Sequence, residues 1–239
     1  MDPIISLRDI RVGYQNTIAL NNINLDIYQG EYIGIFGPNG SGKTSLLSTI
    51  LGLKKPIKGT VKLFNSDNLK KMRVNIGYVP QNPKAKKTFP ASVLEVVEMG
   101  LYGKIGFLKP LRIEDKKQAE KALHDVHMGK FKSRPIGHLS GGELQKVMVA
   151  RALVSEPKVI LLDEPTSALD FLMVKELMEL LTELNEKFNI TIIVINHHLD
   201  LLTPYCSRLL LMNGTIVFDG NPNDKRVKEI IDEIFIKHQ

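Results

Sequence analysis

The stretch Gly37–Thr44 has the residue types and spacing of a phosphate-binding loop, G-x-x-x-x-G-K-[ST]. It follows an apolar run at 32–36 and precedes a run at 45–51 whose apolar residues recur at helical spacing. In a strand–loop–helix context, the N–H groups of the loop converge on phosphate oxygens, and the helix N-terminus adds partial positive charge. Lys43 can then reach the β- and γ-phosphates, and the Thr44 hydroxyl can ligate Mg²⁺. A glycine-rich turn that only caps a helix would not need this full pattern, so we predict a nucleoside triphosphate site.

Two adjacent carboxylates, Asp163 and Glu164, follow the apolar run 159–162. Four apolar residues in a row are typical of a strand buried on both faces of a parallel sheet, and ligands bind at the carboxyl ends of such strands. There Asp163 can take part in the magnesium shell, and Glu164 can polarise the water that attacks the γ-phosphate. The alternative is a solvated pair at the start of a helix. We predict that Glu164 is catalytic, together with Lys43.

Two further side chains have both a structural and a functional interpretation. His197 follows the apolar run 191–195 and could contact the γ-phosphate or hold Glu164 in place, but a single histidine at a strand end is more often structural. Tyr14 lies in a strand-like segment, where a tyrosine is usually half-buried. A role for it in stacking on adenine is favoured only because a nucleotide site must lie close by.

A second glycine-rich segment, Leu139–Glu143, precedes another run with helical spacing. Ser140 and Glu143 form the S-x-x-E pattern of a capping box, in which the two side chains satisfy N–H groups at a helix start. A glycine-flanked helix N-terminus is also favourable for an anion. Taken alone, this segment predicts an ordinary helix start.

The surrounding pattern predicts an α/β protein. Ile23, Leu25 and Ile27 alternate with polar residues as in a strand, whereas the stripes Val93, Val96, Val97 and Ala119, Leu123, Val126 are helical. We therefore expect a helical insertion from about residue 82 to 155 in a core formed by about 1–81 and 156–220. The helix expected after Asp170 has an apolar stripe that begins at Phe171, and Asn213-Gly214 indicates a type I′ hairpin turn. Residues 221–239 are expected to form a tail with a short amphipathic helix.

Composition narrows the class of protein. The chain has 239 residues, of which 43% are hydrophobic and 24% charged, with a formal net charge of +6. Its apolar runs are far too short to span a bilayer, and its start shows no secretory leader. The single cysteine, Cys206, excludes an internal disulfide and fits a reducing cytosol. Without an aromatic-studded basic cluster, we expect no nucleic-acid partner.

These motifs, in this order, resemble the ATP-binding subunit of an ABC transporter over nearly the whole chain. The phosphate loop matches the first nucleotide motif of that family, Leu139–Glu143 its LSGGQ signature with glutamate last, and Val159–Glu164 its second nucleotide motif. Gln81 matches the Q-loop, and Ser167–Asp170 matches the SALD of the D-loop. His197 aligns with the switch histidine, although Asn196 precedes it where the family often has threonine or serine. Tyr14 aligns with the adenine-stacking aromatic.

The resemblance implies a P-loop NTPase core of mixed, mainly parallel sheet, with an N-terminal antiparallel β subdomain and an inserted helical subdomain. It implies ATP and Mg²⁺ as ligands, with Thr44, Gln81 and Asp163 on the metal side and Glu164, His197 and Lys43 as catalytic residues. The residues that it assigns to the nucleotide are Tyr14, Gly37, Pro38, Asn39, Gly40, Ser41, Gly42, Lys43, Thr44, Ser45, Ser140, Gly141, Gly142 and Asp170.

The same resemblance implies a head-to-tail dimer, in which each ATP lies between the phosphate loop of one subunit and Ser140–Gly142 of the other. Gln81 would report the nucleotide state to the face that contacts separate membrane permease chains. An extracytoplasmic substrate-binding protein would be an indirect partner, and the chain would be peripheral at the cytoplasmic face of the membrane.

Two stretches, 89–103 and 134–140, are similar to ATPases of manganese, zinc and iron importers, and those of iron-chelate and cobalamin importers share part of the pattern. We therefore predict import of metal ions or metal chelates. Another cargo, an exporter, or a soluble ABC ATPase of translation or DNA repair are the alternatives. His124, Asp125 and His127 could suggest a metal site, but a solvated helical face is the favoured interpretation.

Overall fold

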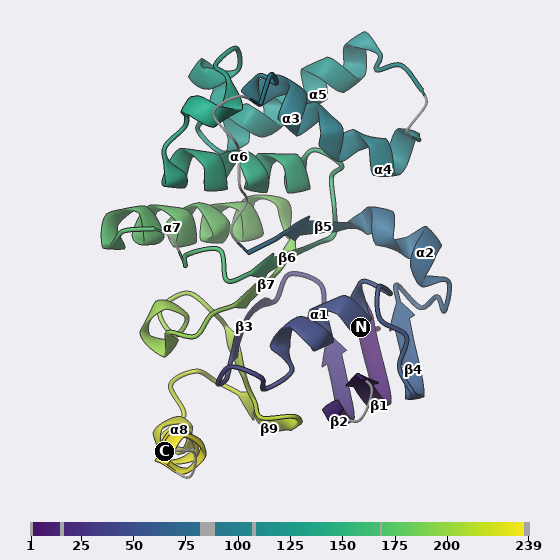
Figure 1. Ribbon diagram of the computed structural model, residues 1–239, viewed down its shortest axis with the longest axis vertical. Helices are drawn as coiled ribbons and strands as arrows, with labels where there is room; N and C mark the ends of the chain where they lie inside the picture. Colours follow the sequence, from purple (N-terminus) through teal and green to yellow (C-terminus); the bar gives the residue numbers. More distant parts are fainter. Residues whose placement is uncertain (1, 15–16, 82–88, 107–108, 168, 237–239) are drawn as a thin grey trace. The chain divides into compact units, whose positions relative to one another are not determined.

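The computed structural model describes residues 2–14, 17–81, 89–106, 109–167 and 169–236. The chain divides into two compact units (Figure 1). The first, unit 1, comprises Met1–Arg73 and Thr191–Gln239, and the second, unit 2, comprises Val74–Ile190. The subdomain boundaries predicted at about residues 82 and 155 stay predictions.

Unit 1 contains a three-stranded antiparallel sheet in the order β2-β1-β4. These strands are β1 (Ile5–Tyr14), β2 (Thr17–Ile27) and β4 (Lys58–Leu63). In β2 the predicted alternation is confirmed, because Ile23, Leu25 and Ile27 are buried. The register of β1 shifts between Leu7 and Ile10, next to Asp9 with its positive φ of 50°, which is the local signature of a β-bulge. The sheet therefore keeps one apolar face despite the irregularity.

Unit 1 also contains a set of strands around the fully buried β3 (Tyr32–Phe36). Strand β3 pairs in parallel with β7 (Thr191–Ile195) and β8 (Arg208–Met212), and β8 pairs antiparallel with β9 (Ile216–Gly220). Runs of adjacent apolar residues form β3 and β7 because both faces of these strands are covered. The helices of this unit are α1 (Lys43–Ile50), α2 (Leu69–Met72) and the amphipathic α8 (Arg226–Ile236).

The β8–β9 hairpin corrects one prediction. Met212 pairs with Ile216, so three residues connect the strands, and Gly214 has a positive φ of 72° while Asn213 does not. A type I′ turn needs a positive φ at two consecutive central residues. The prediction of a type I′ turn at Asn213-Gly214 was therefore wrong, although the hairpin itself is confirmed.

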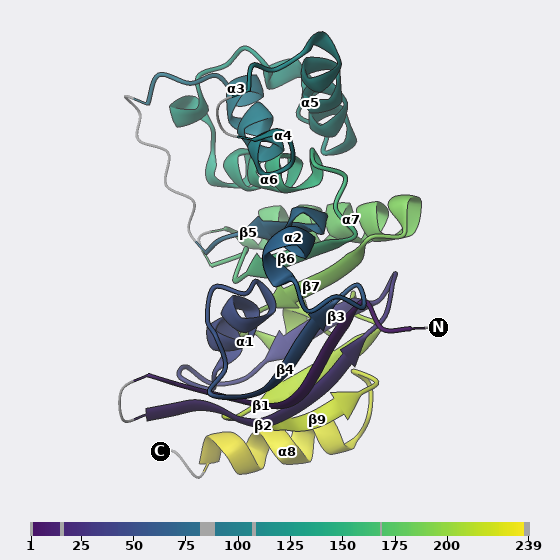
Figure 2. The same cartoon turned by 90° about the vertical axis from the view of Figure 1, so that its right-hand side faces the viewer.

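Unit 2 pairs two parallel strands with a group of helices. The strands are β5 (Ile76–Val79) and β6 (Val159–Asp163). The helices are α3 (Val93–Glu98), α4 (Tyr102–Ile105), α5 (Ile113–Asp125), α6 (Gly141–Leu153) and α7 (Phe171–Phe188). Helices α3, α5 and α6 pack against one another (Figure 2), and both predicted stripes, on α3 and at the end of α5, are buried.

Short 3₁₀ turns complete the elements. They lie at Arg73–Asn75, Met99–Leu101, Gly129–Phe131, Ile136–His138 and Leu199–Leu201. The apolar stripe of α7 is confirmed from Val174 onward, but Phe171 is 76% exposed, so its assignment to the stripe was wrong. Phe171 is the first residue after the N-cap Asp170, a position where the chain is still entering the helix.

The predicted fold class is confirmed: an antiparallel N-terminal sheet, mainly parallel strands and a group of inserted helices. Among the residues that the structure describes, no helix is both long and apolar enough to cross a membrane.

Candidate nucleotide site

The phosphate loop of unit 1 takes its shape from glycines. Gly40 and Gly42 have positive φ angles of 81° and 94°, which a residue with a side chain adopts only with strain. Gly42 is the N-cap of α1 and provides no side chain to satisfy the first N–H groups of the helix, and no acidic residue lies in the first turn. The helix start therefore keeps N–H groups without intrahelical acceptors, next to a lysine. Such a start favours an anion.

Lys43 crosses back over the loop. Its Nζ donates to the carbonyl oxygen of Gly37 at 2.7 Å and to that of Pro38 at 2.9 Å, and the residue is only 6% exposed. The Ser41 hydroxyl is 2% exposed as a residue and has no hydrogen-bond partner within the described part of the chain. A buried hydroxyl without a partner is costly unless a ligand satisfies it. The loop thus fits a bound phosphate.

The turn of the β8–β9 hairpin is hydrogen-bonded to the phosphate loop. The Gly214 N–H donates to the Ser41 carbonyl oxygen at 2.9 Å, and the Asn21 N–H donates to the Gly214 carbonyl oxygen at 2.8 Å. A Cβ on Gly37 would collide with the Met212 carbonyl oxygen. These contacts have no signal in the sequence, because no local pattern links residues so far apart along the chain.

Tyr14 lies close to α1. Its hydroxyl accepts a hydrogen bond from Ser45 Oγ at 3.4 Å, and the Lys54 ammonium lies 3.9 Å from the centre of its ring. Tyr14 is the last residue of β1 and is 47% exposed, so it is about half-buried, as expected for a tyrosine in a strand. An exposed aromatic face beside a phosphate loop is compatible with stacking on a base. Asn39, Gly40 and Thr44 are likewise exposed at the surface of the loop.

His197 follows β7 and is exposed. Its ring lies 4.2 Å from that of His198, at an angle of 48°. Asn196, where the family often has threonine or serine, is fully buried: its N–H donates to the Ile35 carbonyl oxygen and its Oδ1 accepts from the His198 N–H at 2.9 Å. Asn196 therefore fixes the backbone that presents the two histidines.

In unit 2, the carboxylates lie where the sequence placed them, at the end of β6. Asp163 is the last residue of the strand and is 5% exposed, and Glu164 has an unusual φ of 45°. The Gln81 Nε2 donates to the Glu164 Oε2 at 2.7 Å. Burial of the Tyr78 side chain raises its pKa above the usual value, and the negative charge of Asp163 raises it further. The structure thus brings Gln81 to the predicted catalytic carboxylate, and the amide oxygen of Gln81 is an acceptor suited to a metal.

The second glycine loop is built differently. Ser140 is the N-cap of α6, and its Oγ accepts from the Glu143 N–H at 3.3 Å, while the Glu143 Oε2 accepts from the Ser140 N–H at 2.8 Å. The predicted capping box is therefore confirmed. The hydrogen bond from the Ser140 backbone holds the pKa of Glu143 below its usual value. The Arg134 guanidinium also pairs with Glu143, with 3.8 Å between Nη1 and Oε1.

Helix α7 fastens this loop from one side. Asp170 caps α7, because its Oδ1 accepts from the Met173 N–H at 2.9 Å. The Met173 side chain lies against Gly142, where an added Cβ would come within 3.0 Å of its sulfur. The sequence did not predict this role of Met173. Its position three residues after Asp170, where a helix is expected to begin, is the signal that could have identified it. Of the predicted SALD segment, Ala168 lies outside the described residues.

The candidate residues thus form two groups. Unit 1 holds the phosphate loop with Ser45, Tyr14 and His197, and unit 2 holds Gln81, Asp163, Glu164, Ser140–Gly142 and Asp170. The expected solvated helical face is found at His124, but not at Asp125, which is buried and pairs with Lys187 at 2.9 Å. His127 lies beyond the end of α5, is exposed and pairs with Glu183 at 3.2 Å. No group of three or more potential ligands is found among the described residues.

Comparison with known proteins places the chain in context. The family model described as ABC transporter matches residues 20–167. The zinc uptake system ATP-binding protein ZurA of Listeria innocua is 40% identical over 226 residues, which cover 94% of this chain and 88% of that protein. The manganese transport system ATP-binding protein MntB of Bacillus subtilis is 39% identical over 87% of this chain and 83% of its own length.

Solved structures agree with this match. An ATP-binding cassette of an ABC transporter in its ADP conformation superimposes with a TM-score of 0.87 at 28% identity, and 99% of each chain is covered. A dimeric ATP-binding cassette bound to ADP and Pi, in a post-hydrolysis state, gives a TM-score of 0.76 at 30% identity over 92% of this chain and 99% of that one.

Proposed function

The chain belongs to the ABC transporter family as one of its ATPases, and we propose that it powers the import of metal ions, zinc or manganese first, through separate permease subunits. The observation that carries this proposal is the identity of about two residues in five with ATP-binding proteins of zinc and manganese uptake systems, over nearly the whole chain. This identity extends far beyond the nucleotide motifs, so it supports the proposed metal cargo as well as the binding of ATP.

ATP is held first by the phosphate loop. The loop N–H groups and Lys43 bind the β- and γ-phosphates, the Ser41 hydroxyl gains an acceptor, and Tyr14 stacks on adenine. When the γ-phosphate is present, Lys43 exchanges its bonds to the Gly37 and Pro38 carbonyl oxygens for phosphate oxygens. The loop is therefore held in a binding shape before ATP arrives, which reduces the entropy lost on binding.

Hydrolysis needs a positioned water and stabilised charge. Glu164 accepts a proton from the water, and the Gln81 amide at 2.7 Å holds the carboxylate in place. Thr44, Gln81 and Asp163 offer the oxygen donors that suit Mg²⁺. When bound, Mg²⁺ supplies charge neutralisation at the phosphate oxygens. His197 contacts the γ-phosphate side of the site.

The work is done by a dimer. Ser140, Gly141 and Gly142 of one copy close over the ATP held by the other. A similar ATP-binding cassette that is dimeric with ADP and Pi bound supports the dimer. Asp170 orders the segment next to Gly142 through Met173. Because the γ-phosphate joins the two copies, hydrolysis favours their separation. The permease converts this cycle into transport, and an extracytoplasmic binding protein delivers the metal ion. The chain is held peripherally at the cytoplasmic face of the membrane.

The test is to co-purify the chain with its permease and reconstitute both in vesicles. We expect uptake of zinc or manganese that needs ATP on the side of this chain. Uptake should be abolished by Glu164→Gln and unchanged by Glu186→Gln, which removes an exposed carboxylate of α7. If no permease co-purifies, or if uptake follows a different cargo, the metal-import proposal fails while the ATPase assignment stands.

A further inference from the structure

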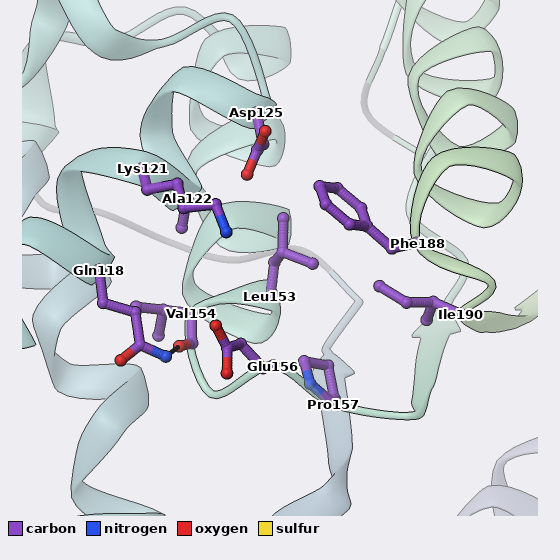
Figure 3. A pocket seen from close by; sticks show the side chains of 10 residues that line it. All are labelled: Gln118, Lys121, Ala122, Asp125, Leu153, Val154, Glu156, Pro157, Phe188 and Ile190. Carbon is purple, nitrogen blue, oxygen red and sulfur yellow. Dashed lines mark hydrogen bonds between the residues drawn. The ribbon is translucent and has the colours of Figure 1, made fainter.

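Unit 2 contains a pocket that none of the nucleotide motifs uses (Figure 3). Its volume is about 260 Å³, slightly below the range of pockets that hold drug-sized ligands. It therefore has room for a small molecule. The residues that line it are Gln118, Lys121, Ala122, Asp125, Leu153, Val154, Glu156, Pro157, Phe188 and Ile190.

The pocket has a charged side and an apolar side. Figure 3 shows the Lys121 ammonium and the carboxylates of Asp125 and Glu156 on one side, with Phe188 and Ile190 on the other. A ligand that fills it must therefore combine a polar head with an apolar body. The Phe188 ring offers that body an aromatic surface, which is a large apolar contact at little entropic cost.

Three helices end at this pocket. Helix α5 ends at Asp125, α6 at Leu153 and α7 at Phe188, and all three residues line it. The C-terminal end of each helix carries about half a negative elementary charge, because its last carbonyl groups have no intrahelical donors. These helix ends favour a cation over an anion, whereas the two lining carboxylates, Asp125 and Glu156, are balanced by the ammonium groups of Lys121 and of Lys187, which pairs with Asp125.

Some of this negative charge is already matched. Lys187 donates to Asp125 Oδ1 at 2.9 Å, and Gln118 Nε2 donates to the Val154 carbonyl oxygen at 2.7 Å. No ion pair of Glu156 is found within the ranges that the structure describes. Glu156 is thus the lining carboxylate that a ligand can neutralise.

Glu156 also stands at an unusual backbone position. Its φ is 51°, and its N–H donates to the Leu153 carbonyl oxygen at 2.8 Å, so it follows α6 in a left-handed conformation. Glu156 lies two residues after the C-cap Val154, and a residue with a Cβ is strained in this conformation, which glycine and, after it, asparagine adopt most readily. Glu156 is exposed, and its carboxylate is one of the groups that line the pocket.

We propose that this pocket binds a small organic monocation, with an ammonium or guanidinium head at Glu156 and an apolar body against Leu153, Phe188 and Ile190. Lys121 weakens binding, because its ammonium lies on the same side of the pocket as the cationic head of the ligand and repels it. The proposal does not rest on the proposed function. A ligand in this pocket would contact the C-terminal ends of α6 and α7. The N-terminal ends of the same two helices begin at Ser140 and Asp170, which belong to the nucleotide motifs.

The probe is 2-phenylethylammonium, which joins a primary ammonium head to an aromatic body of suitable size. We expect a dissociation constant below about 1 mM by calorimetry on the full chain, consistent with the efficiency of small ligands. Chemical shift changes should cluster at Glu156, Phe188 and Leu153. Phenylpropionate, which has the same body with an anionic head, and methylammonium, which lacks the body, should bind at least tenfold more weakly. Equal binding of phenylpropionate would overturn the proposal.

The decisive variant is Glu156→Asn, because asparagine suits the left-handed position better than glutamate does. We expect its melting temperature to be equal or higher while its affinity for the probe falls at least tenfold. The matched control Glu186→Gln should bind like wild type, and Lys121→Met should bind about threefold more tightly. Unchanged affinity in Glu156→Asn, or weaker binding in Lys121→Met, would contradict the assignment of the head to this carboxylate.

Discussion

The helices α1 and α6 both begin at glycine-rich loops, but their N-termini are satisfied in opposite ways. At α1, the N-cap Gly42 has no side chain and the first turn has no acid. At α6, Ser140 and Glu143 already satisfy each other's N–H groups, and the pKa of Glu143 is lowered in consequence. The first start is open to an anion and has a buried lysine beside it, whereas the second is already capped by its own side chains.

This difference separates the loop before α1, which binds the phosphates of ATP, from the loop before α6, which covers the ATP bound by the other copy. The start of α1 is preorganised by distant backbone, with Gly214 and Met212 of the hairpin behind it, and needs an anion to complete it. The start of α6 is complete without a ligand, so it can present the Ser140 hydroxyl and glycine N–H groups on a rigid helix. We therefore expect changes at α1 to impair ATP binding and changes at α6 to impair closure.

The largest effect is expected from Lys43→Ala. The loss of a charged hydrogen-bond donor to phosphate costs about 1.5–3 kcal/mol, so affinity for ATP should fall about 10- to 150-fold by calorimetry. Lys54→Ala, which removes the ammonium from the Tyr14 ring, is the matched control and should change affinity far less. Equal losses from both variants would mean that general positive charge, and not the loop, binds the nucleotide.

A comparison of two glycine variants tests the support of the loop. In Gly37→Ala, the new Cβ would collide with the Met212 carbonyl oxygen, so the hairpin must shift at a cost of about 1–3 kcal/mol. In Gly40→Ala, the Cβ would enter open space, and only the positive φ of 81° opposes it, at about 1 kcal/mol. Chemical denaturation gives both values. If Gly40→Ala were the more damaging, the support by the hairpin would be wrong.

At the second loop, Ser140→Ala should destabilise the chain by about 1 kcal/mol, because the capping oxygen is lost. Affinity of the isolated chain for ATP should stay within about twofold of wild type, since Ser140 belongs to the covering loop. Ser140→Asp, which keeps a capping oxygen, should restore stability. A large loss of ATP affinity in monomeric Ser140→Ala would remove the distinction between the two loops.

The smallest effect concerns Glu143. Its pKa in the folded chain is lowered, so its contribution to stability is present above the unfolded pKa and is lost as the pH falls through the folded one. The free energy of unfolding of Glu143→Gln should therefore be lower than that of wild type by about 0.5 kcal/mol near neutral pH. The difference should be smaller below about pH 4. Melting curves at several pH values measure this. A difference that does not change with pH would show that charge at this helix start is irrelevant.

The sequence predicted what local pattern controls. The S-x-x-E pair specified the capping box at Ser140, and the alternation in β2 specified its buried face. Long-range contacts were beyond it: neither the hydrogen bond from Gly214 to Ser41 nor that from Gln81 to Glu164 has a periodic signal. Periodicity also misplaced Phe171, because a residue at helical spacing is buried only where another element covers it. The roles of the site residues stay predictions for the same reason.

The central claim is that ATP joins two copies of the chain, and sedimentation of Glu164→Gln tests it most directly. With ATP and Mg²⁺ we expect a dimer, with ADP a monomer, and with the added change Ser140→Glu a monomer that still binds ATP, because a carboxylate would then oppose the γ-phosphate. A Glu164→Gln chain that is saturated with ATP and remains monomeric would contradict the account.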